Sequence, residues 1–101
     1  MSLEYETEIL NAMDCRTSII EALQVNSDYE VLTFSDPTCV LLRLTKNPPR
    51  EKWPEDVALF FEDAKVRIVF HMANRVDRQA LVHLLEEELS RLGRLARFVE
   101  S

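Results

Sequence analysis

The chain has 101 residues and a formal net charge of −6; 47% of its residues are hydrophobic and 30% are charged, with four prolines and one glycine. This length gives room for one hydrophobic core, so we expect a single domain over residues 1–101. The composition excludes a disordered chain, and the negative charge disfavours nonspecific binding to nucleic-acid phosphates.

The first predicted element is a helix over residues 3–25, because apolar residues recur there at spacings of three and four. Ser2 can cap its start, and Glu4 and Glu6 suit the positive end of the helix dipole. The polar run at residues 26–28 ends this helix.

Two β-rich runs follow, at residues 29–35 and 39–46. The Asp36-Pro37 pair between them favours a turn, so we predict a β-hairpin. Alternation along its strands puts Val31 and Leu41 on the same side.

The segment 47–56 holds three prolines and is predicted to be a loop, because proline does not fit central strands or helix interiors. It carries the only tryptophan, Trp53. Such a residue serves either as an exposed anchor in a partner's pocket or as a plug folded back on the end of the core. We favour the plug.

A second pair of strands is predicted at residues 57–61 and 66–72, with a polar turn between them. Apolar and other side chains alternate strictly from Val66 to Met72, which is the period of a strand. A short helix over 55–63 is the alternative, because Pro54 and the acidic residues after it resemble a helix start. We favour the strands, since β-branched and aromatic residues are poor helix formers.

The last predicted element is a helix over 77–99, capped by Asp77. Its apolar residues step by three and four from Val82 to Val99, and further apolar side chains widen the face. The chain is therefore expected to be an α+β protein in the order α-β-β-β-β-α. A four-stranded antiparallel sheet would be flanked by long N- and C-terminal helices.

The arrangement of the helices decides what the sheet exposes. If both helices cover one face, the other face presents Val31, Leu41, Phe60 and Val69, more apolar surface than water-facing sheets usually carry. If one helix lies on each side, nothing is exposed. The sequence leaves both arrangements open.

Chemical motifs are weak. His71 is expected to be a partly exposed strand histidine, and His83 with Glu87 a solvated helix pair, because no second ligand pair accompanies them. Cys15 and Cys39 are expected to be free buried thiols in a reducing compartment. No cofactor, no metal and no enzymatic activity are expected.

The chain start lacks a basic region followed by a continuous apolar run, so no signal peptide is expected. No apolar run is long enough to cross a membrane. We therefore expect a cytoplasmic protein, with the nucleus as the alternative.

These observations favour a noncatalytic protein-interaction module: a small adaptor, inhibitor, chaperone-like protein or complex subunit, with a homodimer as the expected assembly. Apolar burial would supply affinity, and arginines would set orientation. The alternative is a nucleic-acid-associated regulator that uses the arginines of the last helix. The expected contact residues are Val31, Leu41, Trp53, Val69, Arg91, Leu92, Arg94, Leu95, Arg97 and Phe98.

Overall fold

The computed structural model describes residues 3–32 and 36–101. Its elements are β1 (Leu3–Glu8), the 3-10 helix η1 (Ala12–Cys15), α1 (Arg16–Gln24), β2 (Tyr29–Val31), β3 (Cys39–Leu44), β4 (Val57–Phe61), β5 (Lys65–Phe70), α2 (Arg75–Arg91) and β6 (Val99–Glu100). The α+β class and the antiparallel sheet are confirmed. The four-stranded count is wrong, because the described part of the chain forms six strands in the order β2-β3-β4-β5-β1-β6.

The predicted helix over 3–25 is wrong in its first half. Residues 3–8 form β1, which pairs antiparallel with β5 from Leu3 opposite Phe70 to Glu8 opposite Lys65. The segment LEYETE alternates with a period of two, and Tyr5 packs edge-on against Phe70 with ring centroids 5.6 Å apart. Burial of this alternating face outweighs helix propensity. The predicted cap, Ser2, lies outside the described residues.

The central strands follow the prediction closely. β4 and β5 form the predicted pair, so the alternative helix over 55–63 is excluded. β3 pairs with β2, although β2 is shorter than the predicted strand, whose residues 33–35 lie outside the described part. Placing Val31 beside Leu41 is wrong: Val31 lies opposite Leu42 and packs against the core. The register of the hairpin instead sets Leu32 opposite Leu41, whose carbonyl accepts its N–H at 2.9 Å.

The predicted helix over 77–99 starts earlier and ends much earlier. Asn74 caps α2, accepting the N–H of Asp77 at 2.8 Å. Gly93 adopts a left-handed backbone (φ 78°), and the N–H of Arg94 bonds to the carbonyl of Leu89 across it. This arrangement ends helices. The chain then returns along β1, where β6 pairs with Tyr5 and Glu6.

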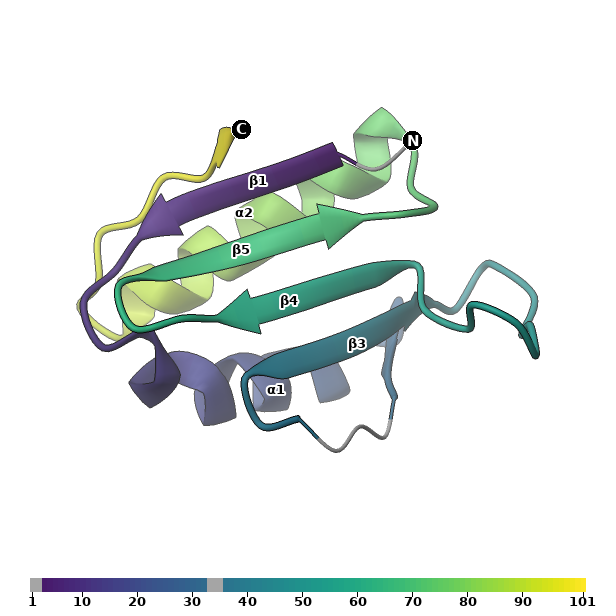
Figure 1. Cartoon of the computed structure of the whole chain (residues 1–101), viewed down its shortest axis with the longest axis horizontal. Coiled ribbons are helices and arrows are strands. Elements are labelled where there is room, and N and C mark those ends of the chain that lie inside the picture. Colours follow the sequence, from purple (N-terminus) through teal and green to yellow (C-terminus); the bar gives the residue numbers. More distant parts are fainter. Residues whose placement is uncertain (1–2, 33–35) are drawn as a thin grey trace.

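Both helices lie on the same face of the sheet (Figure 1), so the alternative with one helix on each side is wrong. Leu81, Leu85 and Leu89, spaced by four on α2, are fully buried, as are Ile19 and Leu23 of α1. They form one cluster with the inward side chains of the strands. Those strand residues are Tyr29, Val40, Leu42, Leu44, Val57, Leu59, Phe61, Val66, Ile68 and Phe70.

Candidate functional site

No helix of residues 3–32 and 36–101 lies on the opposite face of the sheet, which faces the viewer in Figure 1. We call it the open face. Across its middle, Leu41 lies opposite Ala58, Ala58 opposite Val69, and Val69 opposite Glu4. Leu41 and Phe60 are half-buried, whereas Val69 is only 9% exposed. Leu41 is thus accessible on this face, and Val69 is mostly covered.

Ion pairs occupy the part of the open face over β5 and β1. Arg67 contacts Glu4 at 2.9 Å and Glu62 at 3.5 Å, and its guanidinium lies 4.6 Å from the centroid of the Phe60 ring. The hydrogen bond with Glu4 and the charges of both carboxylates raise the pKa of Arg67, despite some burial. This half of the face is therefore polar and internally paired, and the apolar half lies over β3 and β4.

Trp53 extends this surface beyond the end of the strands. Its side chain is 61% exposed, so the predicted plug is wrong. Its ring meets the His71 ring edge-on, with centroids 5.3 Å apart and an angle of 87°. Its backbone is left-handed (φ 55°), which a bulky L-residue rarely adopts unless its surroundings impose it. Trp53 is thus an exposed aromatic residue in a defined conformation.

The loop that carries Trp53 is braced by Arg50 and Asp56. Arg50 donates to the Asp56 carboxylate at 2.6 Å, to the Trp53 carbonyl at 3.2 Å and to the Glu55 carbonyl at 3.4 Å. Asp56 is fully buried, and its second carboxylate oxygen accepts the N–H of Leu44 at 2.8 Å. We call this pair the Arg50–Asp56 clamp.

The pKa of Asp56 reflects two opposing influences. Burial alone disfavours the charged carboxylate. Hydrogen bonds from Arg50, the Leu44 N–H and the Asn47 side chain, together with the positive charge of Arg50, outweigh that effect and lower the pKa. The carboxylate is therefore ionised at neutral pH and holds the loop against the end of β3.

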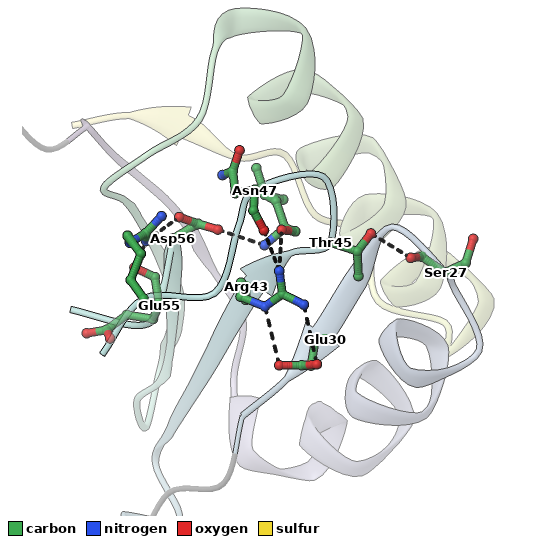
Figure 2. Close-up of polar contacts among 9 residues, drawn as sticks. Ser27, Glu30, Arg43, Thr45, Asn47, Glu55 and Asp56 are labelled. Carbon is green, nitrogen blue, oxygen red and sulfur yellow. Dashed lines mark hydrogen bonds and ion pairs between the residues drawn. The ribbon is translucent and has the colours of Figure 1, made fainter. Parts of the chain in front are cut away.

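The start of the loop is anchored as well. Arg43 on β3 bonds to Glu30 of β2 at 3.4 Å and to the carbonyl of Asn47. Thr45 donates to the carbonyl of Ser27 at 2.8 Å. Figure 2 shows these contacts beside Asp56. The loop is thus fixed at both ends by side chains of the sheet and of the loop itself.

The predicted apolar surface on a C-terminal helix does not exist in that form, because α2 ends at Arg91. Phe98 is buried in the core at 9% exposure, and its N–H donates to Glu86 at 2.9 Å. Leu92 is partly exposed just after the helix, and Leu95 is 93% exposed. Leu95 lines an open groove of about 690 Å³ between β1 and the returning C-terminal segment, on the side away from the Trp53 loop.

The predicted arginine band is also not formed along one helix. Arg91, at the end of α2, pairs with Glu88 at 2.6 Å, which raises the pKa of Arg91. Arg94 donates to the carbonyl of Leu10, and Arg97 lines the groove beside Leu95. Each arginine thus has a different local setting.

The remaining polar candidates are scattered. Cys15 is buried in the core, and Cys39 lies on β3, where burial and the nearby charges of Asp36 and Glu55 raise its pKa despite Arg67. His83 is exposed on α2. Within residues 3–32 and 36–101, no cluster of three or more His, Cys, Asp or Glu is placed to hold a metal ion. No helix in the same residues is long and apolar enough to cross a membrane.

Sequence reasoning missed Arg50 and Asp56. The available signal was weak: an aspartate directly before the continuous apolar run of β4, with an arginine six residues earlier in a proline-rich loop. Comparisons with protein-family descriptions, with curated proteins and with solved structures found no match to this chain. The function is therefore inferred from the geometry of the open face and of the Trp53 loop.

Proposed function

We propose that the protein is a noncatalytic protein-interaction module, an adaptor or complex subunit that binds a partner chain through the open face. Trp53 is its anchor, and Leu41 and Phe60 supply further apolar contact along the open face. The observation that carries this proposal is the exposure of Trp53 in a braced loop at the rim of the helix-free face. Tryptophan is among the residues that most often dominate the binding energy of protein interfaces.

The charged residues around the apolar part of the open face support a partner contact that is apolar at its centre and polar at its edge. The apolar part over β3 and β4 is bordered by the ion pairs of Arg67 with Glu4 and of Lys65 with Glu6. An apolar centre with a polar rim is the usual anatomy of a protein interface. Val69, being mostly covered, contributes less in this proposal than the sequence pattern predicts.

The exposed Leu95 belongs to another surface. It lies beside β1 and β6, away from the Trp53 loop, so the C-terminal arginines and leucines are left out of the proposed contact. This separation makes the two surfaces distinguishable by mutation.

The test begins with the absolute mass of the protein in solution, measured by light scattering over a range of concentrations. A concentration-dependent dimer identifies a second copy of the chain as a partner. Capture from a native extract then compares the wild type with Trp53→Ala and Leu41→Lys. Val25→Ser is the matched control, because Val25 is an exposed apolar residue at the end of α1, on the helix side of the sheet.

We expect Trp53→Ala and Leu41→Lys each to abolish the dimer or the capture of a defined protein, and Val25→Ser to leave both unchanged. Truncating a central anchor commonly weakens binding by about 2 kcal/mol or more, which is about thirtyfold. Binding that survives both open-face variants but is lost in Leu95→Asp would refute the proposed surface. A monomer that captures no protein in any form would refute the function.

A further inference from the structure

We propose that Arg50 and Asp56 are positioning residues, which determine the affinity of the Trp53 anchor without touching the partner. This inference rests on the proposed function above. Both residues hold the loop from within: Asp56 is fully buried, and Arg50 is partly buried with its guanidinium turned to the loop backbone.

Arg50 fixes the path of the loop that carries Trp53. The Arg50 guanidinium reaches the carbonyls of Trp53 and Glu55 as well as the Asp56 carboxylate, so it bridges the whole turn from one side chain. These contacts fix the peptide unit between Trp53 and Pro54 and the one between Glu55 and Asp56. They explain how the left-handed backbone of Trp53 persists, since such a conformation needs an external constraint.

Asp56 also fixes His71, whose ring Trp53 contacts. The Asp56 carbonyl accepts the N–H of His71 at 2.8 Å and of Met72 at 3.2 Å. Its own N–H donates to Leu42 at 2.8 Å, and its carboxylate accepts the N–H of Leu44. Asp56 therefore ties together the end of β3 and the residues after β5. Asp56 thus fixes Trp53 through Arg50, and it fixes His71 through its own backbone carbonyl.

The consequence is a preorganised anchor. A flexible loop must be ordered when a partner binds, and the ordering lowers affinity. In the clamped loop this ordering has already taken place during folding. Loss of the clamp should therefore weaken partner binding by about tenfold, although every contacting side chain is retained.

The experiment uses the free 101-residue chain, because Trp53 is its only tryptophan and the fluorescence reports this ring alone. The variant is Arg50→Gln, which keeps the aliphatic stem as far as Cδ but removes the guanidinium, with its charge and its reach to the loop carbonyls. The matched control is Lys52→Gln, which removes an exposed cation from the same loop. Circular dichroism establishes that all variants are folded.

We expect Arg50→Gln to lower the anisotropy of Trp53 emission. Its quenching by acrylamide should rise by up to about 1.6-fold, because the exposed fraction of Trp53 can rise only from 61% toward full exposure. The ring-current shift that Trp53 imposes on the His71 proton signals should shrink toward its value in Trp53→Ala. Lys52→Gln should match the wild type in all three measurements. Unchanged anisotropy, quenching and His71 shifts in Arg50→Gln would overturn the inference.

The two proposals fail in different ways. If Trp53→Ala leaves binding intact while Arg50→Gln frees the ring, the proposed function is wrong and the clamp is real but serves only the loop. If Trp53→Ala abolishes binding while Arg50→Gln leaves the ring fixed and the affinity unchanged, the open face binds a partner and the clamp does not position its anchor.

Discussion

Replacing Asp56 by asparagine tests how strongly the buried carboxylate holds this end of the sheet. The substitution keeps the shape of the side chain and removes its charge. Asp56 accepts hydrogen bonds from both Arg50 and the Leu44 N–H, on different oxygens. The asparagine amide has one acceptor oxygen and one donor NH₂ group, so one of these two donors meets another donor.

The expected loss in the free energy of unfolding follows from these two hydrogen bonds. A hydrogen bond to a charged group stabilises the fold by about 1.5–3 kcal/mol, and a buried donor left without an acceptor costs about 1–3 kcal/mol. Arg50 is partly exposed, so water replaces some of what it loses. We expect Asp56→Asn to lower the free energy of unfolding by about 2–4 kcal/mol.

Urea unfolding followed by circular dichroism measures this change. With a slope of about 1–1.5 kcal/mol per molar urea, the midpoint should fall by about 1.3–4 M. Asp63→Asn is the control, because the same chemical change in an exposed turn should stay within about 0.5 kcal/mol. A loss below about 1 kcal/mol for Asp56→Asn would show that the buried carboxylate is not a principal constraint, and it would weaken the case for the clamp.

Two further predictions concern pH and the C-terminal segment. The pKa of Asp56 is lower in the folded chain than in the unfolded chain, so its contribution to the free energy of unfolding is complete above the unfolded pKa of about 3.9 and is lost as the pH falls through the folded value. The free energy of unfolding, measured between pH 5 and 2, should therefore fall less steeply for Asp56→Asn than for the wild type. Parallel curves for the two proteins would contradict this. Leu95→Asp should leave the urea midpoint unchanged because Leu95 is exposed, whereas Phe98→Ala should cost about 3–5 kcal/mol because Phe98 is buried. Unfolding of Leu95→Asp would make Leu95 a core residue.

The strands in the middle of the chain could be predicted because their signals are local. Alternation from Val66 to Phe70 and the turn at Asp36-Pro37 depend on neighbouring residues only. The two ends of the chain depend on each other instead. β1 pairs with β5 on one side and with β6 on the other. These strands lie about 60 and 95 residues further along the chain, so that Glu6 lies opposite both Arg67 and Val99. A local pattern carries no record of such pairing, so the glutamates of β1 resembled the start of a helix.

The C-terminal end shows how one residue can override a long pattern. The three-and-four spacing of apolar residues continues unbroken to Val99, yet α2 stops where Gly93 can adopt a left-handed backbone. Beyond this point the apolar residues meet different environments, with Phe98 in the core and Leu95 in solvent. The glycine was the informative residue, because it is the only one in the chain and stands at the position where helices commonly end.

The candidate site was predictable only in its exposed part. Trp53 was noticeable because a tryptophan between prolines in a charged loop is unusual, but the sequence favoured a plug. The contact between two charged residues of that loop explains why the Trp53 ring lies outside. Arg50 turns inward to the buried Asp56 and bonds to the Trp53 carbonyl, and the Trp53 ring is left exposed beside His71. Charged residues normally mark the solvated side of a loop; here Arg50 and Asp56 turn to its interior, whereas Lys52 and Trp53 are exposed.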